Sequence, residues 1–155
     1  MIKIKITNNQ KIKKVHLNKV TRWAKKALTQ LKITNCELSI MFVTDREITK
    51  LNRKYLKRNY PTDVLAFRMQ EGLFLNVSPD ILGDVVISVE TAQRVSRQYR
   101  VRFEHELCLY LLHGILHLIG YRDNTKKSRR ILEQKQQQIQ RKLTNLPLCR
   151  WNIGC

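Results

Sequence analysis

Two histidines four residues apart, His113 and His117, are the side chains of this sequence best suited to hold a metal ion. Residues with this spacing lie on one face of a helix, about 6 Å apart, so two imidazoles can reach the same ion. Gly120 can take the left-handed conformation that ends a helix and turns the chain back, and Asp123 could then approach the ion from the other side. The segment therefore predicts a metal site formed by His113, His117 and Asp123. A fourth position would be open for water, as in catalytic zinc sites.

A simpler interpretation is that the two histidines are core residues whose rings are hydrogen-bonded to neighbours, because a buried imidazole needs a partner. The placement of Gly120 and Asp123 favours the metal site, since it matches the ligand spacing of metzincin proteases. Those proteases carry a glutamate after the first histidine as general base, whereas this chain has Gly114 there. A metallopeptidase is therefore disfavoured. A bound zinc ion can still activate water, since it can lower the pKa of that water to about 7, with help from the substrate or another loop.

The charge of the chain indicates a polyanionic partner. Among 155 residues, 30 are Lys or Arg and 12 are Asp or Glu, which gives a formal net charge of +18. Solubility alone could explain a basic surface, but so large an excess is costly in self-repulsion. Nucleic acid is the partner that matches it best. A membrane is not expected, because the longest apolar run, Leu107 to Ile119, is broken by two histidines and is too short to span a bilayer.

The four cysteines and His105 are not expected to take part in the chemistry. No CxxC pair occurs among Cys36, Cys108, Cys149 and Cys155. We expect reduced thiols, with Cys108 buried as a small apolar residue. The N-terminal segment alternates like a strand and lacks the apolar run of a signal peptide, so a cytoplasmic location is expected. His105 lies eight residues before the first histidine of the pair, and it is predicted to be partly exposed at a helix start rather than a group that supports the metal ligands.

Hydrophobic periodicity predicts strands and helices that mix along the chain. Strands are expected at 2–6, 36–42, 64–69 and 82–89, and helices at 15–31, 45–55, 90–100, 104–119 and 126–143. Residues 72–80 are expected to form a loop or a short hairpin arm, and the run Gln136 to Gln138 is the only low-complexity feature. The pattern predicts one small α/β (or α+β) domain over residues 1–155. It would have about four strands flanked by about five helices, with the metal site on a central helix.

Three blocks of the sequence together resemble the YbeY family of bacterial rRNA maturation factors. The signature block is His113-Gly-Ile-Leu-His117-Leu-Ile-Gly120-Tyr. The second block is Leu51-Asn-Arg-Lys-Tyr55 followed by Pro61-Thr-Asp-Val-Leu-Ala-Phe67, and the third is Leu82-Gly-Asp-Val-Val-Ile-Ser88. The resemblance implies a small sheet flanked by helices, with a metal ion, expected to be zinc, on a central helix. It also implies a single-strand endoribonuclease that acts in ribosomal RNA maturation and ribosome quality control.

The chain departs from the family pattern at several positions. The third ligand of the family is normally histidine, and the aligned residue here is Asp123; a shift of one residue would place Asn124 there instead. A carboxylate is a competent zinc ligand, and its negative charge makes the ion a weaker Lewis acid. The arginine that the family usually carries after the tyrosine of the second block is Leu56 here. The family's Ser and Pro near the end of that block are Ala66 and Arg68.

The expected RNA contacts lie in the second block, which the family places beside the metal. The candidate RNA-binding residues are Arg53, Lys57 and Arg58. The two charges that follow Leu56 could replace the missing arginine. With the three residues of the metal site as the catalytic groups, the prediction is a zinc-dependent endoribonuclease. Its expected partners are single-stranded ribosomal RNA and the ribosome or its proteins. The alternative is a non-catalytic RNA- or ribosome-binding assembly factor with a structural or degenerate metal site.

Overall fold

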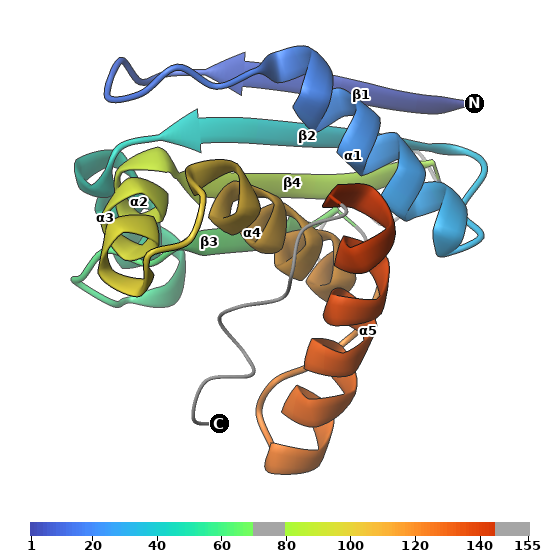
Figure 1. Cartoon of the computed structure of the whole chain (residues 1–155). Coiled ribbons are helices and arrows are strands. Elements are labelled where there is room, and N and C mark those ends of the chain that lie inside the picture. Colours follow the sequence, from blue (N-terminus) through green and yellow to red (C-terminus); the bar gives the residue numbers. More distant parts are fainter. Residues whose placement is uncertain (70–79, 145–155) are drawn as a thin grey trace.

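The computed structural model of the chain describes residues 1–69 and 80–144. In this part of the chain, strands and helices follow the predicted order (Figure 1). The strands are β1 (Ile2–Asn8), β2 (Cys36–Val43), β3 (Val64–Arg68) and β4 (Ile81–Ser88). The helices are α1 (Leu17–Gln30), α2 (Asp45–Leu56), α3 (Val89–Tyr99), α4 (Phe103–Leu118) and α5 (Lys126–Thr144). The predicted fold class is confirmed. Most of the loop expected at 72–80, together with Cys149 and Cys155, lies outside the described residues.

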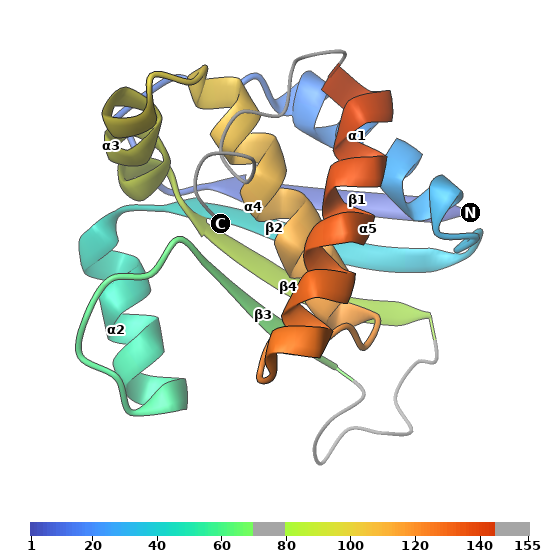
Figure 2. The ribbon, with the colours of Figure 1, turned by 60° about the horizontal axis from the view of Figure 1, so that its bottom comes forward.

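The strands form one mixed sheet in the order β1-β2-β4-β3. Strands β1, β2 and β4 run parallel, and β3 pairs antiparallel with β4. Successive side chains of a strand point to opposite faces of a sheet. Val85 and Ile87 of β4 therefore join the main hydrophobic cluster with residues of α1, α4 and α5, whereas Val86 joins a smaller cluster with residues of α2. Figure 2 shows the result, with α1, α4 and α5 on one side of the sheet and α2 on the other.

Helix α4 is the central element of the core. Most of its side chains from His105 to Leu118 are buried, including the free Cys108, as predicted. Burial raises the pKa of the Cys108 thiol. The helix approaches the sheet closely at Gly114, because a Cβ at this position would lie 2.5 Å from Cγ1 of Val85. Among the described residues, no helix has the length and apolar character needed to cross a membrane.

Helix α2 and strand β3 hold the second sequence block. Thr44 caps the helix, since its Oγ1 accepts a hydrogen bond from the backbone N–H of Glu47 at 3.3 Å. The helix ends at Leu56, and Lys57 takes the left-handed conformation with a φ of 55°. The chain then turns toward β3. Because β3 lies at the edge of the sheet, only one of its sides pairs with another described strand.

Candidate metal centre

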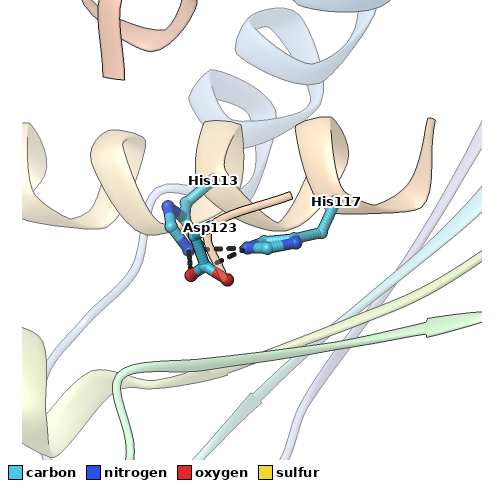
Figure 3. Close-up of side chains that lie close together, drawn as sticks. All are labelled: His113, His117 and Asp123. Carbon is cyan, nitrogen blue, oxygen red and sulfur yellow. Dashed lines mark hydrogen bonds and ion pairs between the residues drawn. The ribbon is translucent and has the colours of Figure 1, made fainter. Parts of the chain in front are cut away.

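His113 and His117 lie one turn apart on α4, and the turn after this helix brings Asp123 to them (Figure 3). The Nε2 atoms of the two imidazoles are 3.0 Å apart. Oδ2 of Asp123 lies 3.5 Å from Nε2 of His117 and 3.8 Å from Nε2 of His113. Gly120 has a φ of 111°, which L side chains rarely adopt, so glycine permits this return of the chain. The structure thus brings together the three residues that the sequence singled out.

The three donor atoms fit one divalent cation. Atoms bound at about 2.0–2.1 Å to one tetrahedral ion lie about 3.3–3.4 Å from one another. The observed separations of 3.0, 3.5 and 3.8 Å bracket that value. The side chains are 26% (His113), 27% (His117) and 49% (Asp123) exposed, so an ion and a substrate can reach them. Two imidazoles and one carboxylate form a donor set that catalytic zinc sites use.

The protonation of His117 also suits a cation. Burial and the neighbouring His113 lower the pKa of His117, which favours the neutral imidazole near neutral pH. Asp123 and the backbone of Tyr121 raise the pKa of His117 and oppose this shift in part. On the other ring, Nδ1 of His113 lies 3.1 Å from Oε1 of Gln136 on α5. The ring of His113 therefore has a further contact besides those within the cluster.

His105 is buried, contrary to the expectation of a partly exposed residue at the start of the helix. Its exposed fraction is 3%, and burial lowers the pKa of its imidazole. Its backbone carbonyl accepts a hydrogen bond from Gln140 at 3.1 Å, because α5 packs across this part of α4. The periodicity of α4 alone carries no information on this contact. His105 lies outside the three-residue cluster.

An open cavity of about 580 Å³ surrounds the cluster. Its walls come from the end of α2, the loop before β3, all five residues of β3, helix α4 and the turn after α4. This volume lies in the range of small-molecule sites, so a nucleotide-sized group can enter. Among the described residues, the rings of Tyr60, Phe67 and Tyr121 line the wall. The signature block and the second block of the sequence therefore meet at one cavity.

Of the three candidate RNA-binding residues, Arg58 lines this cavity, and Arg53 and Lys57 lie outside its lining. The guanidinium of Arg53 donates two hydrogen bonds to Oδ1 of Asn59, at 2.9 and 2.6 Å. Lys57 follows the last residue of α2, and its backbone N–H donates to the carbonyl of Arg53 at 3.2 Å. Leu56, at the position of the family's arginine, lines the cavity and is 48% exposed. Of the three candidates, Arg58 is therefore the one that lines the cavity.

The sequence pattern did not indicate four further polar residues at the site. Arg68, Arg122 and Asp63 line the cavity, and Gln136 contacts His113. Arg122 is next to the predicted third ligand and Arg68 ends β3, so their places in the blocks were a usable signal. Gln136 carried no such signal, because it lies 23 residues from His113 along the chain. Only the packing of α5 against α4 brings these two side chains together.

Fold and site together define a class of protein, an α/β protein whose central helix carries two histidines of a candidate metal centre. A model of the family described as Endoribonuclease YbeY matches residues 5–144. A relative named Endoribonuclease YbeY from Syntrophus aciditrophicus is 39% identical over 147 residues, which cover 94% of this chain and 92% of the relative. Another of that name, from Syntrophotalea carbinolica, is 40% identical over 138 residues, 88% of this chain and 92% of the relative. The chain belongs to the YbeY family.

A solved structure shares the fold. The solution structure of a Thermotoga maritima protein matches with a TM-score of 0.64 and 24% sequence identity. The match covers 92% of this chain and 89% of that chain. At this identity, the likeness shows only that the sheet and its helices have the same arrangement.

Proposed function

We propose that the chain is a metal-dependent endoribonuclease that cleaves single-stranded RNA. The observation that carries the proposal is the approach of His113, His117 and Asp123 to one another inside an open cavity that arginines also line. The name Endoribonuclease YbeY, carried by the family and by relatives that are 39% and 40% identical, supports this reaction. The net charge of +18 supports a polyanionic substrate. In this proposal, residues 1–155 act as one hydrolase domain.

The proposed catalytic residues are the three that would hold the ion, and zinc is the proposed ion. Two imidazoles and a carboxylate suit it, and three protein donors leave room for a substrate oxygen. When bound, such an ion polarises a phosphoryl oxygen and lowers the pKa of a water molecule. Asp123 would bring a negative charge that a histidine at its position would not, so it would weaken the ion as a Lewis acid.

Cations and aromatic rings on the cavity wall would hold the RNA. Arg58 and Arg122 line the cavity from two separate segments, and guanidinium groups bind phosphates with paired hydrogen bonds. Tyr60 and Tyr121 line the same wall. Unpaired bases stack on such rings, which favours a single strand over a duplex. The other two candidate RNA-binding residues, Arg53 and Lys57, would add positive charge along the approach to the cavity.

The edge of β3 offers backbone groups to the same RNA. The N–H of Ser88 donates to the carbonyl of Asp63 at 2.9 Å, so these two residues form a hydrogen-bonded pair that extends the β3–β4 ladder. Because such pairs alternate along an antiparallel ladder, the backbone groups of Val64 and Ala66 point away from β4. The N–H of Val64 accordingly donates to the Asp63 carboxylate at 2.8 Å. No described strand pairs with the other edge of β3, so the N–H and C=O of Ala66 would be available there to a phosphate or a base.

Ribosomal RNA is the proposed substrate, with roles in its maturation and in ribosome quality control. The resemblance of three sequence blocks to the YbeY family supports this setting. The ribosome or its proteins are the proposed partners, and the cytoplasm is the proposed location. The strongly basic composition supports partners that are rich in phosphate.

Cleavage of a labelled single-stranded RNA by the purified protein tests the proposal. We expect cleavage that chelation abolishes and zinc restores. His117→Ala is expected to lose both bound metal and cleavage. A duplex of the same sequence serves as the control substrate and is expected to stay intact. A wild-type protein that cleaves RNA equally well after complete removal of metal would contradict the proposed mechanism.

A non-catalytic RNA- or ribosome-binding assembly factor with a structural or degenerate metal site is the second candidate function. Two residues at the cavity favour it, namely Asp123 in place of the family's histidine and Leu56 in place of its arginine. Salt-sensitive RNA binding without cleavage in the presence of zinc would support this function. The double variant Leu56→Arg, Asp123→His separates the two candidates. Cleavage by this variant but not by wild type would identify the wild type as the binding protein.

A further inference from the structure

We infer that Gln136 is a positioning residue of the metal centre, which determines the ring nitrogen that carries the proton of His113. The inference rests on the metal site proposed above and adds to it a residue from α5. The two nitrogens of this ring have different surroundings. Nε2 faces His117 and Asp123, and Nδ1 lies 3.1 Å from Oε1 of Gln136.

The contact with Gln136 selects the form of His113 that can bind a cation. A ring nitrogen binds a cation through its lone pair, so a neutral His113 that binds through Nε2 must carry its proton on Nδ1. That proton needs an acceptor, and Oε1 of Gln136 is one. The reversed amide would place an NH2 group against Nδ1 and would favour the proton on Nε2, where it blocks binding. Ligating histidines commonly donate their second N–H to such an acceptor.

The side chain of Gln136 is buried beside the metal centre. The residue is 1% exposed, and it lies on the face of α5 that also buries Leu132 and Ile139 in the main core. Among the described residues, Nε2 of Gln136 has no hydrogen-bond partner. A buried NH2 without a partner is unfavourable, and an apolar side chain of the same size would avoid that cost. The hydrogen bond to His113 is the contact that such an apolar side chain could not make.

Zinc affinity of the purified full-length chain, measured by competition with a chromophoric chelator, tests the inference. Gln136→Met keeps the size of the side chain and removes the acceptor, and we expect zinc binding about 10- to 100-fold weaker. Gln136→Glu supplies an acceptor again and is expected to bind zinc at least as tightly as wild type. Rescue by this variant would distinguish the positioning of the ring from the filling of space.

Gln140→Met is the matched control. Gln140 is as buried as Gln136, lies one turn further along α5, and donates to the backbone carbonyl of His105 instead of contacting a ligand ring. We expect its zinc affinity to equal that of wild type. Thermal melts of all variants measure the loss of stability separately from the loss of zinc.

A second measurement needs no metal. In nitrogen-15 NMR spectra of the metal-free protein, the ring of His113 is expected to carry its proton on Nδ1 in wild type and in Gln136→Glu. A mixture of the two neutral forms is expected in Gln136→Met. A wild-type ring with its proton on Nε2 would overturn the inference even if a variant failed to fold.

Equal zinc affinity in wild type and Gln136→Met would also overturn it. So would an equal loss in Gln140→Met, because the loss would then come from the general packing of α5. A wild type that binds no zinc would refute both this inference and the proposed metal centre. A wild type that binds zinc without cleaving RNA would contradict only the proposed function, so the two failures are distinguishable.

Discussion

Gly114 of α4 lies directly against Val85 of β4, since a Cβ on Gly114 would come within 2.5 Å of Cγ1 and 3.0 Å of Cγ2 of the valine. It would also lie 3.3 Å from Cγ2 of Val64 on β3. This close approach seats the central helix against the two strands beside the cavity. It also explains why the position after His113 carries no glutamate. There is no room for a larger side chain, so the missing protease base is a consequence of packing.

Gly114→Ala is expected to destabilise the fold. Alanine favours a helix over glycine by about 1 kcal/mol, but overpacking a core costs about 1–3 kcal/mol. Val85 is β-branched and has little rotamer freedom to move aside, so we expect a cost in the upper part of that range and a net loss of up to about 2 kcal/mol. Urea denaturation followed by circular dichroism measures it. The double variant Gly114→Ala, Val85→Ala is the control. It removes the clash, so it shows how much of the lost stability comes from the contact with Val85. An unchanged urea midpoint for Gly114→Ala would refute the contact.

Asp123→Asn is expected to lower the metal content of the purified protein well below that of wild type, whereas Asn124→Ala is not. Oδ2 of Asp123 faces both histidines. Oδ1 of Asn124 instead accepts a hydrogen bond from Oγ of Ser128 at 3.3 Å. Mass spectrometry of metals after gel filtration provides the measurement. Asp123→His, which carries the family's usual ligand, is expected to retain the ion. Loss of metal in Asn124→Ala alone would move the third ligand by one residue.

The sequence predicted those parts of the fold and site that have a local cause. Helix α4 is apolar along most of its length, β2 alternates, and α2 begins with the cap formed by Thr44 and Glu47. The metal cluster was predictable for the same reason. Both histidines and the turning glycine lie within one helix and the turn after it. Spacing along the chain therefore translates directly into distance in space.

The parts that could not be predicted depend on contacts between distant segments. The burial of His105 and the hydrogen bond of Gln136 to His113 both arise from the packing of α5 on α4. Nothing in the sequence of either helix specifies that pairing. Arg53 and Arg58 carry the same side chain and lie five residues apart. Arg53 is hydrogen-bonded to Asn59, whereas Arg58 lines the cavity. The direction of the chain at and after the end of α2 determines which of the two arginines lines the cavity.

Arg58→Ala is expected to weaken binding of single-stranded RNA more than Arg53→Ala. Both variants remove one positive charge, so the second is a matched control. Arg58 lines the cavity, whereas the guanidinium of Arg53 is bonded to Asn59. Fluorescence anisotropy at several salt concentrations measures the affinity. The slope of log affinity against log salt is expected to fall by about 1 in Arg58→Ala. The same loss in both variants would show that only net charge matters.

Protonation of Asp45 in acid is expected to lower the stability of the fold. Its carboxylate accepts hydrogen bonds from Ser88, Thr91 and Arg94 at 2.6, 2.5 and 2.8 Å. Burial opposes the charge, but these hydrogen bonds and the charge of Arg94 outweigh it and lower the pKa of Asp45. The unfolded chain therefore takes up this proton at a higher pH than the folded protein does. The stabilisation is complete above the ordinary Asp pKa of about 3.9 and is lost as the pH falls through the lowered folded value.

Urea midpoints at pH 7 and at about pH 3 check this expectation for Asp45. Asp45→Asn is expected to lose stability at the higher pH and to differ less from wild type at the lower pH, since protonation removes the same charge. Asp80→Asn, at an exposed position, is the control and is expected to leave the pH dependence unchanged. A constant difference between Asp45→Asn and wild type at both pH values would exclude a role for its ionisation.

Ala66→Pro is expected to reduce RNA cleavage while the protein stays folded. Proline removes the backbone N–H, which at this position of β3 points away from β4, so the sheet ladder is unaffected. The residue before a proline prefers the extended conformation that a strand already has. A hydrogen bond to a charged group contributes about 1.5–3 kcal/mol, so we expect kcat/KM to fall about 10- to 100-fold. Steady-state cleavage of a labelled single-stranded RNA measures it.

Two variants at the same strand control this experiment. Ala66→Ser keeps the N–H and is expected to cleave RNA like wild type. Leu65→Pro removes an N–H that points into the ladder toward β4, so it is expected to lower the melting temperature, unlike Ala66→Pro. An Ala66→Pro protein with wild-type kcat/KM would rule out the edge of β3 as an RNA contact. Because this substitution leaves every arginine in place, a loss of cleavage would separate a backbone contact from the contribution of Arg58.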